Sequence, residues 1–173
     1  MTERPEPSPQ PDERTALESF LDYFRATLLW KAEGLTDQQA RSATVEPSIM
    51  SIAGLLRHMA EVERHWFQMY LRGDAENRLF WCGDDPDADF HVPDSATLAD
   101  CVSLFEREVA TSREITRHFN LDDLAALSDR QRGLDSDWRP NLRWIMVHMI
   151  EEYARHAGHA DLIRERIDGA TGD

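Results

Sequence analysis

The sequence HMIEEYARHAGHADLIRERI, residues 148–167, predicts one long helix near the C-terminal end of the printed chain. At about 100° per residue, with His148 as the origin, His159 falls at about 20°, Glu152 at about 40° and His156 at about 80°. Isoleucines fall in the same sector, so one face mixes apolar residues with these polar groups. A face that only packed against a core would not carry them, because each buried polar group needs a partner.

Glu152 and His156 are one helical turn apart, at positions i and i+4, so their side chains share a face and can bind one ion. An E-x3-H pair alone is weak evidence, because Glu and His are common on helix surfaces. The pair therefore predicts a metal site only if another part of the chain supplies a third ligand.

Three other stretches have the apolar spacing of amphipathic helices, with capping residues at their starts. No stretch predicts a convincing strand, and one long loop joins the second and third helices. The sequence therefore predicts an all-α four-helix bundle. The expected helices cover residues 12–33, 51–73, 97–119 and 141–168. A short helical turn is also expected at 121–127.

The loop at residues 74–94 contains two prolines, one glycine and six aspartates, which prevent a regular element. Its apolar residues are too many for a solvated linker, so we expect an ordered loop that walls a pocket and contacts substrate. Cys82 lies in this loop and is expected to be a structural or incidental thiol rather than a reactive one, and Cys101 is expected in the core. The two cysteines form no CxxC pattern, so no disulfide framework is expected.

The composition suits one domain, because the chain has 173 residues and 41% of them are hydrophobic. The net charge of −14 argues against nucleic-acid phosphate or an anionic membrane surface as a partner. No run of about 18 apolar residues could span a bilayer, and no apolar segment marks a secretory signal. We expect a cytoplasmic protein that acts on a small molecule, with a disordered tail at 1–11 and a single domain at 12–169.

The missing ligand can come from the second helix, where His58 lies inside an apolar stripe. If the second and fourth helices face each other, His58 can meet Glu152 and His156 in the bundle interior. Two imidazoles and a carboxylate suit zinc or another divalent transition metal, with water completing the shell of a catalytic site. The alternative is that His58 is a hydrogen-bonded core histidine.

The remaining polar residues of these two helices are expected to support or surround the site. His65, His148 and His159 are expected to orient ligands or to pack beside them. Arg155 could bind an anionic group near the site, or pair with Glu151 or Asp161. Charges expected to be solvated or to link helices are Glu61, Glu63 and Glu151.

Residues 51–67, SIAGLLRHMAEVERHWF, and 143–169, RWIMVHMIEEYARHAGHADLIRERIDG, resemble the DinB/YfiT-like superfamily of metalloenzymes. The closer resemblance is to an actinobacterial branch that is catalogued as a domain of unknown function. This branch is related to mycothiol-dependent transferases and maleylpyruvate isomerase. The resemblance covers almost the whole chain after its first residues.

The resemblance implies a four-helix bundle with a three-ligand metal site, usually made of three histidines. The ligand from the second helix matches His58, and the two from the last helix match Glu152 and His156. The glutamate departs from the all-histidine pattern and resembles the set in the maleylpyruvate isomerase relatives. The resemblance therefore implies zinc as the first choice of metal and nickel as the next.

The leading hypothesis for function is a metal-dependent enzyme that uses or transfers a low-molecular-weight thiol, similar to mycothiol, on a small electrophile. The second hypothesis is a metal-dependent hydrolase of a small amide or ester, with Glu151 or Glu61 within reach as the general base. The third is a non-catalytic metal- or ligand-binding bundle that acts in a stress response. Spare apolar residues on the first and third helices predict a homodimer.

Overall fold

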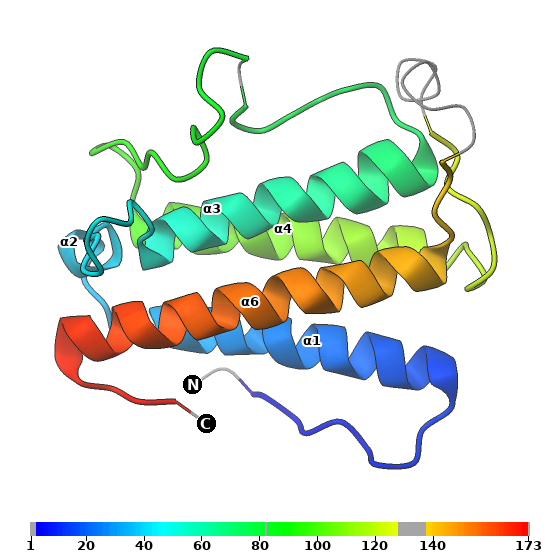
Figure 1. Cartoon of the computed structure of the whole chain (residues 1–173), viewed down its shortest axis with the longest axis horizontal. Coiled ribbons are helices and arrows are strands. Elements are labelled where there is room, and N and C mark those ends of the chain that lie inside the picture. The colour runs from blue at the N-terminus through cyan, green and yellow to red at the C-terminus, as the bar shows by residue number, and fades with distance from the viewer. Residues whose placement is uncertain (1–2, 82, 128–137, 173) are drawn as a thin grey trace.

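The computed structural model describes residues 3–81, 83–127 and 138–172 of the chain, and this part is built from helices (Figure 1). The predicted all-α four-helix bundle is confirmed. The second of its long helices is made of two consecutive segments, α3 and η1, and a short helix, α2, precedes it. The elements are α1 (Glu13–Ala32), α2 (Asp37–Ala40), α3 (Ile52–Glu63), η1 (Arg64–Arg72), α4 (Leu98–Thr116) and α6 (Leu142–Asp168).

The four long helices pack as two pairs, α1 with α6 and α3 with α4, and α3 also contacts α1 and α6. In Figure 1, α1 and α6 run in one direction, and α3 with η1 and α4 run in the other. The chain therefore has to return along the length of the bundle between η1 and α4. The segment between Gly73 and Thr97 makes this crossing outside the bundle (Figure 1).

The helix starts follow from local capping, which is why the sequence predicts them well. At each of four starts, the cap side chain accepts a hydrogen bond from the backbone N–H three residues later. The four cap residues are Asp12, Ser51, Thr97 and Asn141. The C-cap of η1 is Gly73, whose φ of 80° lies in the left-handed region that glycine adopts without strain.

The second long helix differs from the expected single α-helix, because its second half, η1, is a π-helix with a wider turn. Two side chains of this segment bind the same carboxylate on α4. Arg64 donates to Glu108 at 3.0 and 2.7 Å, and Gln68 donates to Glu108 at 2.7 Å. Phe67 and Leu71 both enter the core at a spacing of four residues. The π-helical segment is therefore also the segment that bonds to α4. An apolar spacing of 3.6 residues in the sequence does not distinguish this π-helix from an α-helix.

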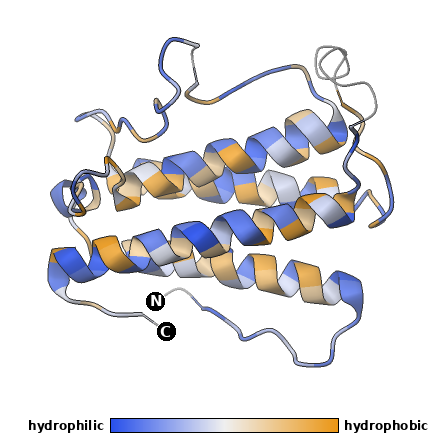
Figure 2. Ribbon diagram, in the orientation of Figure 1, coloured by the Kyte–Doolittle hydropathy of each residue, from blue (hydrophilic) through white to orange (hydrophobic). Residues whose placement is uncertain are grey.

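The core lies where the four helices face one another, and apolar positions recur along each of them (Figure 2). Its fully buried side chains come from every long helix. They include Leu21, Leu28, Ile52, Leu55, Leu56, Met59, Phe105, Ile145 and Met149. Cys101 is also buried, as expected, and burial raises the pKa of its thiol.

A buried polar network interrupts this core and links α1, α3 and α6. Arg25 of α1 donates to both oxygens of Glu63 on α3, at 2.8 and 2.9 Å. Tyr153 of α6 donates its hydroxyl to Glu63 at 2.6 Å. Of the two alternatives expected for Glu63, a solvated charge or a charge that links helices, the structure shows the link between helices. Burial raises the pKa of Tyr153, so its hydroxyl stays protonated and remains a donor.

Of the predicted helical turn at 121–127, only residues 121–122 form a turn, which the bond from the Asp123 N–H to the Asn120 carbonyl closes at 3.0 Å. This segment holds an isolated bridge between Leu124 and Asn141, and it extends along the end of η1. There, the N–H groups of Ala126 and Leu127 bond the carbonyls of Leu71 and Tyr70 at 2.9 and 3.1 Å. Pairing with η1 across the fold therefore takes the place of local helix formation.

Within the described ranges, no helix has both the length and the apolar character that crossing a membrane requires. Before α1, the guanidinium of Arg4 lies over the rings of Tyr23 and Trp30, at 4.9 and 4.6 Å from their centroids. The division into a tail at 1–11 and a domain at 12–169, the cytoplasmic location and the homodimer stay predictions.

Candidate metal centre

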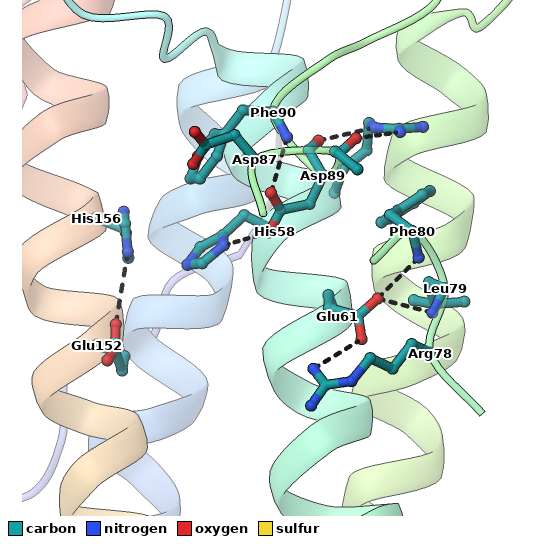
Figure 3. A network of polar contacts seen from close by, with 12 residues as sticks. His58, Glu61, Arg78, Leu79, Phe80, Asp87, Asp89, Phe90, Glu152 and His156 are labelled. Carbon is teal, nitrogen blue, oxygen red and sulfur yellow. Dashed lines mark hydrogen bonds and ion pairs between the residues drawn. The ribbon is translucent and has the colours of Figure 1, made fainter. Parts of the chain in front are cut away.

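The structure brings His58, Glu152 and His156 together between α3 and α6. One donor atom from each residue lies within 4.8 Å of the donor atoms of the other two. The rings of His58 and His156 are 4.7 Å apart between centroids, and His156 Nε2 is 3.5 Å from Glu152 Oε2. Figure 3 shows the three side chains converging from the two helices. The predicted site required a third donor from another part of the chain. In this geometry His58 of the second long helix lies where that donor is needed.

The crossing loop holds His58 in place. Nδ1 of His58 lies 2.7 Å from Asp89 Oδ2, and Phe90 stacks on the imidazole with centroids 4.7 Å apart (Figure 3). An ionised carboxylate only accepts hydrogen bonds, so in the uncharged ring Nδ1 carries the proton and Nε2 has the lone pair. Arg57 fixes the loop by donating to the carbonyl oxygen of Asp89 at 2.9 Å.

Asp89 is a site residue that the sequence does not single out. It is one of six aspartates in the loop, and spacing along the chain does not distinguish it from the others. The sequence offered one indication of this contact, the apolar Phe90 beside Asp89. An apolar residue in a polar loop is expected to pack against the rest of the protein. The fold of the loop decides which aspartate reaches His58.

His156 is the most buried of the three donors, with 7% of its surface exposed. Burial is the main cause that lowers the pKa of His156 to about 3, and His58, His159 and Arg155 nearby act in the same direction. The imidazole is therefore uncharged at neutral pH, and an uncharged imidazole has the lone pair that metal binding needs. His159 lies beside it, with the two Nδ1 atoms 3.4 Å apart.

The predicted supporting residue His148 lies against Glu152. Its Nε2 is 3.7 Å from Glu152 Oε1, and its ring packs between Trp66 and Trp144 at centroid distances of 4.7 and 5.1 Å. His148, Glu151 and Glu152 form a second group of donors within 4.8 Å of one another. Glu151 is exposed, which makes this group a weaker candidate than the first.

Two other predicted residues lie at the edge of the centre. Arg155 forms an ion pair with Glu151, one of the two partners expected for it, and its Nη1 is also 3.5 Å from Glu152 Oε2. His65 is not among the converging donors, and packs against Trp66 and Tyr70 of η1. Burial, with a smaller effect of Arg78, lowers the pKa of His65 to about 4.

Glu61 is neither solvated nor paired with another long helix, so the expectation for this residue is wrong. It is 6% exposed, and its Oε2 accepts hydrogen bonds from the N–H groups of Leu79 and Phe80 at 2.7 and 3.0 Å (Figure 3). The two apolar residues bring the loop back onto α3. The carboxylate accepts hydrogen bonds from the backbone N–H groups that this packing removes from water.

A cavity of about 170 Å³ lies beside His58, between α3 with η1 and the crossing loop. Its walls include loop residues, as expected for a loop that encloses a pocket. Cys82 falls outside the described residues. The cavity is lined by His58, Glu61, Val62, His65, Arg78, Trp81, Pro86 and Asp89.

The donor set fits a divalent transition ion. It offers two imidazole nitrogens and one carboxylate, which is a set that zinc and its neighbours accept. Asp89 fixes the tautomer of His58, as outer partners of metal-binding histidines commonly do. Among the described residues, the group of donors around His58 has three members, and neither His148 nor His159 belongs to it. That these residues bind a metal stays a prediction.

Comparison with known proteins gives one match over most of the chain. The sequence model of a family described as mycothiol-S-transferase matches residues 16–169. A second match is to zeatin O-xylosyltransferase of Phaseolus vulgaris, with 32% identity over 95 residues, which are 53% of this chain and 21% of that protein. The chain thus spans about a fifth of the length of this relative, and the activity in its name belongs to a much longer protein.

Proposed function

The chain belongs to the mycothiol-S-transferase family, which is DinB/YfiT-like, and from this premise we propose that it transfers mycothiol to a small electrophile with the help of a divalent metal. The observation that carries the proposal is the convergence of His58, Glu152 and His156 within the matched range. Zinc is the first choice of metal, with nickel next, because the ligand set is the one that zinc commonly has in proteins.

The proposed ligands are Nε2 of His58, a carboxylate oxygen of Glu152 and Nε2 of His156. When bound, a divalent ion supplies positive charge that favours the thiolate form of a thiol over its protonated form. Asp89 keeps the proton of His58 on the far nitrogen, and His148 lies against the carboxylate of Glu152 and limits its rotation. In the transfer, the thiol proton goes to solvent and the sulfur forms a bond to carbon. The leaving group departs with its bonding electrons.

The hydrolase alternative has less support from the geometry. Glu151 pairs with Arg155 at the surface, and Glu61 is engaged by two loop amides. Glu151 lies within 4.8 Å of Glu152 but is exposed and ion-paired, and Glu61 reaches the cavity beside His58 with Oε1 while its Oε2 is bonded to the loop. The non-catalytic alternative would be favoured by a fourth protein donor that closed the set, and within the described ranges the group around His58 has three.

The proposal is tested by following thiol consumption with mycothiol and an electrophilic test substrate. We expect activity in the zinc-loaded protein, loss after chelation and recovery when zinc is restored. His58→Ala should remain inactive under all three conditions. Turnover of ester or amide substrates without any thiol would instead support the hydrolase.

A further inference from the structure

Two buried polar atoms beside His58 have no hydrogen bond. Among the described residues, the buried side-chain atoms without a hydrogen-bond partner are Glu61 Oε1, His65 Nδ1 and Ser112 Oγ. The first two residues line the same cavity of about 170 Å³, and His58 lines it too. Buried polar atoms are nearly always bonded, because leaving one unpaired costs its full desolvation. Two such residues in one cavity therefore indicate a site for a polar ligand.

The carboxylate of Glu61 cannot turn away to find another partner. Its Oε2 is fixed by the N–H groups of Leu79 and Phe80, and the side chain is 8% exposed. The nearest positive charge to Oε1 is Arg78 Nη1, at 3.9 Å, which is too long for a hydrogen bond. The loop therefore holds one carboxylate oxygen at the cavity with its capacity to accept unused.

The rest of the lining defines the chemistry of the ligand. Val62 and Pro86 are apolar, and the ring of Trp81, 42% exposed, carries the guanidinium of Arg78 at 4.8 Å from its centroid. An anionic group would meet the carboxylate of Glu61, and a cationic group would meet Arg78. An uncharged group fits both, provided that it donates an O–H or N–H to Glu61 and has carbon atoms to pack on the apolar walls.

We propose that this cavity is a substrate subsite, in which Glu61 Oε1 accepts a hydrogen bond from a hydroxyl or amide N–H of the ligand and His65 Nδ1 makes a second bond. The subsite rests on the proposed function, because it assigns the cavity to one of the two substrates of the thiol transfer. Its contact with His58 places the held group next to the reacting sulfur. Either the thiol or the electrophile can carry the donor group, and the experiment separates the two sources.

The backbone amides of Leu79 and Phe80 report on the subsite, because both bond the carboxylate of Glu61 directly. ¹⁵N-labelled, zinc-loaded protein is titrated to saturation with mycothiol and, separately, with 2-chloroacetamide, an electrophile that carries an amide N–H. Shifts of these two amides with mycothiol assign the subsite to the thiol, and shifts with chloroacetamide assign it to the electrophile. If neither ligand moves them, the subsite is overturned.

Steady-state kinetics of two variants and one control test the same subsite through KM and kcat. Glu61→Gln can still accept from Leu79 and Phe80, but it presents an NH₂ where Oε1 was, and His65→Phe keeps the ring without its nitrogen. Each variant should raise the KM of the assigned substrate about tenfold and leave kcat within about twofold. Ser112→Ala, at the third unpartnered atom, should leave both constants unchanged.

The outcomes separate the subsite from the proposed function. If the wild-type protein consumes no thiol and the Leu79 and Phe80 amides still shift, the thiol transfer is wrong and the subsite stands. If the wild-type protein is active, the amides do not move and both variants keep the wild-type KM, the subsite is wrong and the transfer stands.

Discussion

Two polar clusters join α3 to α6, and they differ in how completely their atoms are paired. In the cluster of Arg25, Glu63 and Tyr153, the bonds to the carboxylate are 2.6–2.9 Å long. In the cluster of His58, Glu152 and His156, the donor atoms face one another within 4.8 Å, and the Glu152–His156 distance is 3.5 Å. The first cluster is complete without a ligand. The second holds its donor atoms at longer distances from one another, and a bound ion would complete it.

The largest predicted effect comes from breaking the complete cluster. Glu63→Ala leaves the buried guanidinium of Arg25 with only the half-exposed carboxylate of Asp22, 2.9 Å from its Nη1, so the free energy of unfolding should fall by about 3 kcal/mol. The measurement is urea unfolding of the metal-free protein. His58→Ala should cost about 1–2 kcal/mol under the same conditions, because it removes the hydrogen bond to Asp89 and the stack on Phe90 but leaves no buried cation without its partner.

A control for this prediction is Glu114→Ala, which breaks an exposed pair with Arg117 at 2.8 Å and should change stability far less than Glu63→Ala. Equal losses from Glu63→Ala and His58→Ala would contradict the distinction between a structural and a ligand-binding cluster.

The next effect concerns the residue that orients His58. Asp89→Asn should weaken zinc binding about 10- to 100-fold, because the carboxylate no longer fixes the tautomer and ring of the ligand. A competition titration with a chromophoric chelator measures the affinity.

Asp85 offers a matched control in the same loop, because its carboxylate lies 2.7 Å from Nδ1 of His91, the same distance as in the Asp89–His58 pair. Asp85→Asn should leave zinc affinity unchanged. If Asp89→Asn and Asp85→Asn bound zinc with equal affinity, Asp89 would have no special role in orienting His58.

The smallest effect is a pH dependence at His65, beside the second cluster. Its folded-state pKa of about 4 lies below the unfolded value of 6.5, so the unfolded chain binds this proton first as the pH falls. Stability from this group is therefore present above pH 6.5 and is lost progressively between pH 6.5 and about 4.

His65→Phe should remove this part of the loss. Between pH 7 and 5 the metal-free variant should lose about 1–2 kcal/mol less of its free energy of unfolding than the wild-type protein loses. Urea titrations at the two pH values give the comparison. Parallel losses in both proteins would show that the imidazole is not held uncharged by burial.

The parts of this picture that depend on neighbouring residues in the chain could be predicted from the sequence. Thr97 and Asn141 cap helices through side chains that act within one turn. Glu152 and His156 share a face because helical geometry puts residues i and i+4 together. His58 needed one further step, the assumption that two amphipathic helices face each other.

The parts that depend on contacts across the fold could not be predicted. The π-helix at 64–72 is accompanied by bonds from Arg64 and Gln68 to Glu108 on another helix. Asp89 reaches His58 because of the path of the loop, and Glu61 is buried because that loop returns over it. Each of these three features depends on contacts between residues that are distant in the sequence, so no local sequence pattern predicts it.

The most direct test of the central claim is the metal content of protein purified without a histidine tag, measured for the wild type and for His58→Ala by elemental analysis. The account predicts about one divalent ion per chain in the wild type and a loss of nearly all of it in the variant. An anomalous signal between α3 and α6 would place the ion. Full metal content in His58→Ala, or no binding by the wild type after incubation with zinc or nickel, would contradict the account.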